Sequence, residues 1–284
     1  MIVVTGASGQ LGRLVVEFLL QRLPAGQIVA AVRNPKKVAD LAARGVQVRQ
    51  ADYTDPASLR RAFAGADKVL LISGNEIGQR VPQHAAVIEA AQAAGVTRLL
   101  YTSLLHADVS PLALADEHRQ TERLIRDSGL EYVLLRNGWY TENYLASVPA
   151  ALSHQVLLGS AGEGRIASAA RADYAEAAAI VLTQPQASGT VYELAGDETY
   201  TLAEFAAAIG EAAGTQVRYQ DLPQAEFAAV LEQAGLPAGF AQLLSDSDVG
   251  ASQGGLFDDA GDLRRLLGHA TTSWREMVRS AVAG

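Results

Sequence analysis

The stretch IVVTGASGQLG, residues 2–12, decides the fold of the amino-terminal half of the chain. It places Gly6, Gly9 and Gly12 directly after a short apolar run, in the order G-x-x-G-x-x-G. Gly6 permits a tight turn, Gly9 lets the backbone approach a pyrophosphate, and Gly12 lets the following helix pack closely on a sheet. The helix N-terminus offers N–H groups and a partial positive charge to phosphates. The pattern predicts a dinucleotide site, and the alternative is a glycine-rich turn without a ligand.

Around this turn, apolar runs alternate with segments of helical periodicity. Leu11, Leu14, Val15, Phe18 and Leu19 follow the turn as one apolar helical stripe. Runs that are apolar throughout suit parallel strands covered on both faces, and repeated β-α units with short connections predict a Rossmann-type, doubly wound parallel sheet. The six runs are residues 2–5, 28–32, 46–49, 68–73, 98–103 and 131–135.

After about residue 150 this alternation loosens. We expect residues 1–150 to form the dinucleotide-binding domain and residues 151–284 to form a smaller α/β substrate-binding lobe. Ligands of open α/β sheets bind at the carboxyl ends of the strands, so we expect the lobe beside that edge. No linker separates the two parts cleanly, and we expect them to be interleaved.

Local signals mark the ends of several helices. Asp55 before Pro56 predicts an N-cap, and Gly95 predicts the end of the helix before the fifth run. Thr201 and Glu204 have the spacing of a capping box.

The composition of the 284 residues excludes several classes of function. The net charge of −8 and the lack of a basic stripe argue against a nucleic-acid surface. There are no cysteines, which excludes disulfides and cysteine-ligated metals. The chain begins with a strand-like run instead of a signal peptide, and its apolar runs are too short to cross a bilayer. We therefore expect a soluble cytoplasmic protein without membrane insertion.

The end of the second run favours NADPH over NADH. A site for NAD usually has an acid there, which accepts hydrogen bonds from the ribose 2′-hydroxyl. This chain has Arg33 at that position, with Lys36 and Lys37 just beyond, and no acid competes for the position. A guanidinium grips a 2′-phosphate with two hydrogen bonds. The alternative is a solvated basic turn.

Further candidates follow the third, fourth and sixth runs. Asp52 could accept a hydrogen bond from the adenine amino group, or it could cap its own loop. Residues 73–75 end the fourth run, where backbone passes under the second ribose of the cofactor, and residues 137–142 could touch the nicotinamide. Trp139 and Tyr140 could instead form an aromatic lid on the core.

Together these residues resemble the NmrA-like group of atypical short-chain dehydrogenases, and within it the NADPH-dependent quinone reductases of bacteria. The matching blocks run nearly end to end, and the most specific are TSLLHADVSP, LLRNGWYTENYLAS and SDSDVGASQGGLFDD. The group also contains triphenylmethane-dye reductases and NADP-sensing regulators. The resemblance implies cofactor contacts at Gly6, Ala7, Ser8, Gly9, Gln10, Leu11, Arg33, Ser73, Gly74, Asn75, Asn137, Gly138, Trp139, Tyr140, Thr141 and Glu142.

One pair expected of many short-chain reductases is missing. Where they carry Tyr-x-x-x-Lys, this chain has Leu114 and His118, and the YVLLR at 132–136 lies in a strand. Reduction of an isolated ketone gives a basic alkoxide, which a positioned acid helps to protonate. A quinone gives an aromatic phenolate instead, so positioning of donor and acceptor is enough. The absence argues against an ordinary alcohol dehydrogenase, not against hydride transfer.

No catalytic residue is assigned from the sequence, but three side chains are candidates near the substrate. His118 could be a surface histidine bonded to a neighbouring acid, or it could face the site as a weak proton donor. His106 follows the fifth run, nearer the expected nicotinamide, and Asn143 could bond a quinone oxygen or cap a helix. The histidines show no metal-ligand spacing, so we expect no metal.

We therefore expect a reductase that transfers hydride from NADPH to a small quinone without flavin or metal, as a monomer or homodimer. The alternatives are a regulatory protein that senses NADP(H), and a reductase of cationic dyes or imines.

Overall fold

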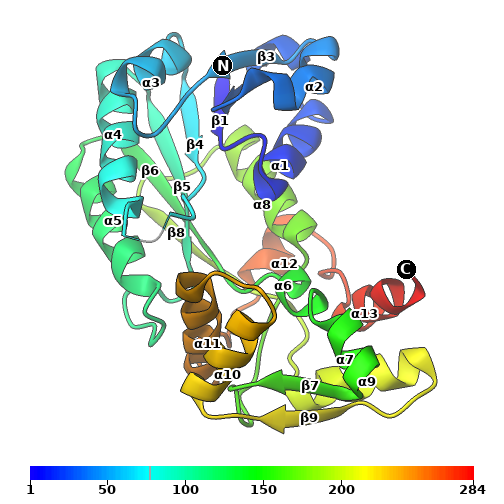
Figure 1. Cartoon of the computed structure of the whole chain (residues 1–284). Coiled ribbons are helices and arrows are strands. Elements are labelled where there is room, and N and C mark those ends of the chain that lie inside the picture. The colour runs from blue at the N-terminus through cyan, green and yellow to red at the C-terminus, as the bar shows by residue number, and fades with distance from the viewer. Residues whose placement is uncertain (77) are drawn as a thin grey trace. The chain divides into compact units, whose positions relative to one another are not determined.

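The computed structural model describes residues 1–76 and 78–284 of the chain (Figure 1). The chain divides into two compact units, each made of three segments. The first unit comprises Met1–Leu104, Glu117–Asn137 and Ala172–Tyr192. The second comprises Leu105–Asp116, Gly138–Arg171 and Glu193–Gly284. The chain thus passes back and forth between the units, and the division at residue 150 into a cofactor domain and a substrate lobe stays a prediction.

The first unit is built on a parallel sheet with the strand order β3-β2-β1-β4-β5-β6-β8, whose last strand ends in the second unit. In register, Ile2 of β1 lies opposite Ile28 of β2 on one side and Lys68 of β4 on the other. This order and the parallel pairing confirm the predicted Rossmann-type, doubly wound fold. The strands are β1 (Ile2–Thr5), β2 (Ile28–Val32), β3 (Gln47–Gln50), β4 (Lys68–Leu71), β5 (Arg98–Leu104), β6 (Glu131–Asn137) and β8 (Thr190–Leu194).

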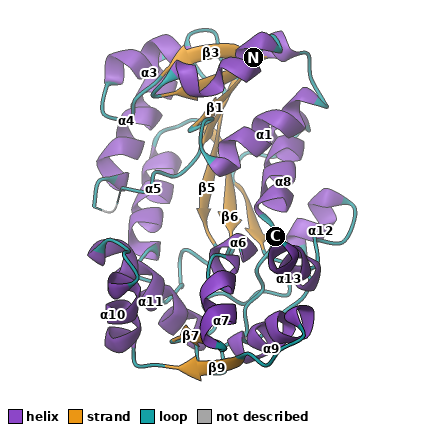
Figure 2. Cartoon of the chain, turned by 45° about the vertical axis from the view of Figure 1, so that its right-hand side comes forward, coloured by secondary structure: helices purple, strands orange, loops and turns teal. Residues whose placement is uncertain are grey.

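Helices cover both faces of this sheet, with α3, α4 and α5 on one face and α1 and α8 on the other (Figure 2). On the first face, Val3, Val69 and Leu99 of the strands pack with Phe63 and Val87 of the helices in one buried cluster. Burial on both sides explains why these strands are apolar throughout. The helices are α1 (Gln10–Leu20), α2 (Ala39–Ala43), α3 (Pro56–Phe63), α4 (Arg80–Ala93), α5 (Ala115–Asp127) and α8 (Arg171–Thr183), with 3₁₀ turns at Ala25–Gln27 and Pro35–Val38.

The second unit is mainly helical, with a small parallel sheet of β7 (Val156–Gly159) and β9 (Arg218–Asp221). Its core contains an aromatic cluster of Tyr144, Tyr200, Phe205 and Trp274. The nearest two rings of this cluster, Tyr200 and Trp274, have centroids 4.5 Å apart. Its helices are α6 (Thr141–Leu145), α7 (Val148–His154), α9 (Leu202–Ala213), α10 (Gln224–Gln233), α11 (Ala238–Ser252), α12 (Asp262–Leu267) and α13 (Trp274–Ala283).

The local signals in the sequence are confirmed. The Asp55 side chain accepts from the backbone of Ala57 and Ser58 at the start of α3, Gly95 has φ of +69° after α4, and Thr201 and Glu204 form a reciprocal capping box.

One strand ends earlier than predicted. The fourth run was expected to stay extended in the sheet to residue 73, but β4 stops at Leu71. The reason is that Thr5 Oγ1 accepts from Ile72 N, and Thr102 Oγ1 accepts from Ser73 N. Side chains of the neighbouring strands therefore replace the strand ladder at this point.

Candidate cofactor site

The glycine-rich turn joins β1 to α1 in a conformation that its sequence requires. Gly6 has φ of +60°, and Gly9 N donates to Gly6 O at 2.9 Å. A Cβ on Gly12 would lie 2.4 Å from Gly6 O and 2.8 Å from Ala7 Cα. Gly12 is thus needed because α1 approaches the backbone of the turn itself, whereas the sequence predicted an approach of the helix to the sheet.

The start of α1 suits a phosphate. No side chain of residues 1–76 or 78–284 caps this end of the helix, and no acid lies in its first turn. Gly6, Ser8, Gly9 and Gln10 are exposed, whereas Ala7 and Leu11 are buried and anchor the turn. The first N–H groups of a helix lack intrahelical partners and carry partial positive charge, so this exposed end can bind a pyrophosphate.

Arg33 follows β2 directly, at the same edge of the sheet. Its side chain is 70 % exposed, and its Nη1 lies 3.3 Å from Glu76 Oε1. We predicted that no acid competes for this position, which holds for the sequence around Arg33. The structure nevertheless brings an acid to Arg33 from the segment after β4, 43 residues along the chain.

Asp52 caps its own loop. Its Oδ1 accepts from Thr54 N at 2.9 Å and from Thr54 Oγ1 at 2.7 Å. These hydrogen bonds, with a smaller contribution from the charge of Arg33, lower the pKa of Asp52 and keep it ionised. The capping role is confirmed, and a contact with adenine stays a prediction.

The segment that follows β4, residues 72–76, is called the β4 loop below. Both backbone polar groups of Gly74 are held by side chains: its N–H donates to His84 Nε2 at 3.0 Å, and its carbonyl accepts from Arg80 Nε at 2.9 Å. Arg80 is buried and also donates to Glu117 Oε2 of α5 at 2.7 Å. The backbone predicted to pass under the cofactor is thus positioned by buried side chains of α4.

His84 must be neutral to hold this position. Because Nε2 accepts from Gly74, the ring proton lies on Nδ1, which donates to Thr121 Oγ1 at 3.0 Å. The hydroxyl of Thr121 in turn donates to Glu117 O at 2.9 Å. Burial, with the nearby charge of Arg80, lowers the pKa of His84 to about 3, so this arrangement persists at neutral pH. This role could not be predicted from the sequence, because the loop that His84 supports is 10 residues away from it.

His118 is a buried residue, and its interpretation as a surface histidine bonded to a neighbouring acid is wrong. Its side chain is 4 % exposed, and its Nδ1 lies 2.6 Å from Tyr101 OH. Burial, with the charge of Arg80, lowers the pKa of His118 well below its ordinary value. The ring is therefore neutral at physiological pH and does not act as an imidazolium donor.

Residues 138–143 lie in the second unit, whereas Asn137, at the end of β6, lies in the first. Tyr140 contacts Arg171, whose guanidinium carbon is 4.6 Å from the ring centroid, and Trp139 is buried against Tyr144. Glu142 accepts from Arg171 N at 3.0 Å. Thr141 is buried, and its hydroxyl lies 2.8 Å from Ser168 Oγ. These contacts order the segment within its own unit.

Asn143 is the third residue of α6, which begins at Thr141 with Tyr140 as its N-cap. The expectation that Asn143 could cap a helix is therefore wrong. Its side chain is half-buried and makes no hydrogen bond to any residue in the described ranges 1–76 and 78–284. Its amide remains available to a ligand.

His106 has an unusual backbone for a non-glycine residue, with φ of +51°. Its backbone N–H donates to Glu193 Oε2 at 2.8 Å, its Nε2 lies 3.2 Å from Asp258 Oδ2, and its Nδ1 lies 3.7 Å from Glu193 Oε2. Both ring nitrogens thus face carboxylates. His106 would have to break one of these contacts to reach a quinone oxygen.

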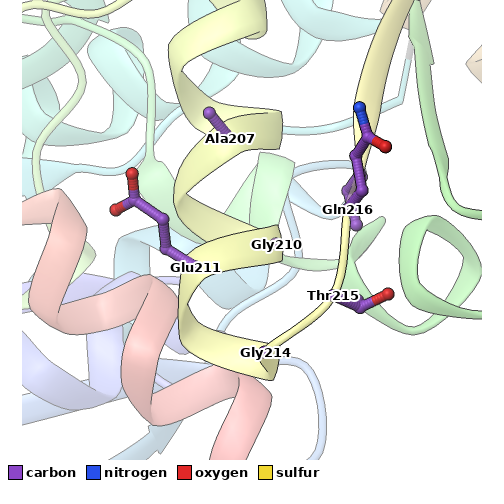
Figure 3. A pocket seen from close by; sticks show the side chains of 7 residues that line it. Ala207, Gly210, Glu211, Gly214, Thr215 and Gln216 are labelled. Atoms are coloured by element: carbon purple, nitrogen blue, oxygen red, sulfur yellow. The ribbon is translucent and has the colours of Figure 1, made fainter.

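A separate hollow of about 620 Å³ lies in the second unit at the C-terminal end of α9 (Figure 3). Glu211 is the one charged residue of its lining, and no aromatic ring contributes to it. It lacks the groups that would hold a dinucleotide or a quinone. The described part of the chain has no cluster of His, Cys, Asp and Glu suited to a metal ion, and none of its helices is long and apolar enough to cross a membrane.

Residues 6–185 match the model of a family described as NAD(P)H-binding. The chain is 60 % identical to quinone oxidoreductase 2 of Escherichia coli K12 over 278 residues, which cover 98 % of this chain and 97 % of the relative.

Two solved structures are similar over nearly their whole length. The crystal structure of NADPH-dependent quinone oxidoreductase QOR2 from E. coli, complexed with NADPH, has a TM-score of 0.97 and 59 % identity and covers 99 % of each chain. Triphenylmethane reductase of Citrobacter sp., complexed with NADP(H), has a TM-score of 0.95 and 38 % identity, over 99 % of this chain and 100 % of the other.

Proposed function

Because the chain belongs to the NAD(P)H-binding family, in which it has NmrA-like relatives, we propose that it is an NADPH-dependent reductase that transfers hydride to quinones without flavin or metal. This membership confirms the resemblance seen in the sequence. The proposal is carried by the near-full-length similarity to E. coli quinone oxidoreductase 2, and the turn before α1 supports it because its exposed, uncapped helix end suits a pyrophosphate.

We assign the binding of NADPH to residues at the carboxyl ends of the strands. The turn of Gly6, Ala7, Ser8, Gly9, Gln10 and Leu11 would hold the pyrophosphate, and Arg33 would hold the 2′-phosphate. Ser73, Gly74 and Asn75 would support the nicotinamide ribose from the β4 loop. Asn137, Gly138, Trp139, Tyr140, Thr141 and Glu142 would border the nicotinamide.

The chemistry needs little from the protein beyond position. Bound NADPH supplies the hydride, and one proton from solvent completes the quinol. The side-chain amide of Asn143 makes no hydrogen bond within the described part of the chain, so it can donate to a quinone oxygen and stabilise the phenolate that forms there. A general acid is unnecessary for this product, which agrees with Leu114 and the neutral His118 in place of a Tyr-x-x-x-Lys pair. His106 is a second candidate to contact the quinone.

The test is NADPH oxidation by purified, flavin-free protein with a panel of quinones, with NADH as the second donor. We expect turnover that prefers NADPH and that neither added flavin nor a metal chelator changes. Tight binding of NADPH without turnover on any acceptor would contradict the proposal and would indicate an NADP(H)-sensing protein.

A second candidate function is reduction of cationic dyes or imines, which the 38 % identity to triphenylmethane reductase favours. Such a dye also accepts hydride without needing a proton from the protein. Including a triphenylmethane dye in the same panel separates the two functions, since the better acceptor has the higher kcat/KM.

We further propose that the protein acts in the cytoplasm and that it is a monomer or homodimer. Analytical ultracentrifugation would test the oligomeric state.

A further inference from the structure

The β4 loop carries an acid that neither the glycine motif nor the basic turn explains. Glu76 directly follows the Ser73–Asn75 segment assigned to the cofactor, and its carboxylate contacts the guanidinium assigned to the 2′-phosphate. A carboxylate beside a phosphate-binding arginine opposes binding of NADPH, because like charges repel. The position of Glu76 therefore calls for a role in cofactor choice.

Glu76 is held more firmly than Arg33. Its Oε2 accepts from Gln83 Nε2 at 2.7 Å, and Gln83 lies on α4 with only 7 % of its surface exposed. The contact of Oε1 with Arg33 is longer, at 3.3 Å, and Arg33 is largely exposed. When a phosphate arrives, Arg33 is free to turn toward it, while Gln83 keeps the carboxylate in place.

The two cofactors meet this carboxylate differently. The 2′-phosphate of NADPH carries a charge between about −1.5 and −2, so it must draw Arg33 from Glu76 and then remain near an uncompensated acid. The 2′-hydroxyl of NADH is neutral and can donate a hydrogen bond to a carboxylate, as it does to the acid of NAD-specific sites. Glu76 therefore opposes the first cofactor and not the second.

We propose that Glu76 is a specificity-determining residue that moderates the preference for NADPH which Arg33 creates, and so keeps NADH usable. This inference rests on the proposed cofactor site. It assigns to the β4 loop a role in the discrimination between the two nucleotides, in addition to its contact with the ribose.

The deciding variant is Glu76→Gln, which removes the charge, keeps the length of the side chain and can still accept from Gln83. We expect the Kd of NADPH, measured by fluorescence titration, to fall about threefold to tenfold, because an exposed charge has a modest effect. The Kd of NADH should stay the same or rise. The gain in NADPH affinity caused by Glu76→Gln should shrink as salt is added, since salt screens charges.

Glu131→Gln is the matched control. Glu131 is 48 % exposed, against 47 % for Glu76, and also pairs with an arginine, Arg98, but at the amino end of β6. It should leave both Kd values unchanged. In an Arg33→Ser background, Glu76→Gln should improve NADPH binding less than in the parent. Glu76 and the 2′-phosphate then no longer compete for the same guanidinium.

The outcomes separate this inference from the proposed function. If the parent protein binds no NADPH, the proposed cofactor site is wrong and the inference fails with it. If the parent binds NADPH but Glu76→Gln leaves the ratio of the two Kd values unchanged, or weakens NADPH selectively, the role of Glu76 alone is overturned.

Discussion

The glycine-rich turn and the β4 loop follow neighbouring strands, β1 and β4, yet they are held in different ways. The turn is shaped by its own backbone, through the positive φ of Gly6 and the close approach at Gly12. The β4 loop is held from outside, by His84 and Arg80 of α4. Both segments were expected to contact the cofactor, but only the shape of the turn could be predicted from its own residues. The support of the β4 loop by His84 and Arg80 could not be predicted from the sequence.

The largest effect is expected for Gly12→Ala. The new methyl group would clash with the backbone of Gly6 and Ala7, so the turn must distort. We expect NADPH affinity to fall about a hundredfold or more, and the free energy of unfolding to fall by about 1–3 kcal/mol. Titration calorimetry and urea unfolding measure the two. Gly26→Ala is the control, because no atom of the residues that the structure describes lies within 4 Å of its added Cβ.

Arg33→Ser tests the side chain that complements the turn. Charge-assisted hydrogen bonds to a phosphate are lost, so NADPH should bind about 10- to 100-fold more weakly. NADH should be nearly unaffected. Arg61→Ser is a matched control, since Arg61 is also 70 % exposed. Equal losses for both nucleotides would contradict the assignment of Arg33 to the 2′-phosphate.

His84 tests whether the β4 loop depends on outside support. His84→Leu leaves Gly74 N without its acceptor, whereas Gln can place an oxygen near the position of Nε2. We expect His84→Leu to raise the KM for NADPH about tenfold, and His84→Gln to restore most of it. A purely structural role would lower the melting temperature and the active fraction of both variants without separating their KM values.

The smallest effect on NADPH binding is expected for a change at Asp248, which is buried in the second unit. It accepts from Tyr144 OH at 2.9 Å and from Ser160 N at 3.0 Å, and burial raises its pKa to about 6. The folded protein therefore holds this proton more tightly than the unfolded chain does. The resulting stability is present below pH 4 and is lost as the pH rises through about 6, by at most about 3 kcal/mol.

Asp248→Asn should flatten the dependence of unfolding free energy on pH between about 4 and 6, measured by urea unfolding, with NADPH affinity unchanged. Asp259→Asn, a change at an exposed acid of the same unit, should preserve the slope. An unchanged slope in Asp248→Asn would show that its ionisation does not control stability in this range.

The parts of the fold that depend on neighbouring residues could be predicted from the sequence. The strands were apolar because helices cover both faces of the sheet, and the caps at Asp55 and Thr201 use residues within three positions. The turn before α1 could be predicted for the same reason, because its shape depends on its own residues. Arg33 was recognised because it directly follows β2, at the edge where ligands of such sheets bind.

The missed features depend on contacts between residues far apart in the chain. Glu76 meets Arg33 across 43 positions, and Asp248 meets Tyr144 across 104. His118 was weighed as a surface residue because acids surround it in the sequence, but Tyr101 of β5 is its partner. Helical periodicity alone did not separate its buried face from its exposed one.

The interleaving of the two units has a consequence for synthesis on the ribosome. Strand β6 is complete at Asn137, but its outer neighbour β8 begins only at Thr190. While the intervening residues emerge, β6 presents an unpaired edge, which is the kind of surface that pairs wrongly with other chains. Release of a chain shorter than about 190 residues would leave that edge permanently open. Nascent fragments of this protein should therefore need a chaperone more than the finished chain does.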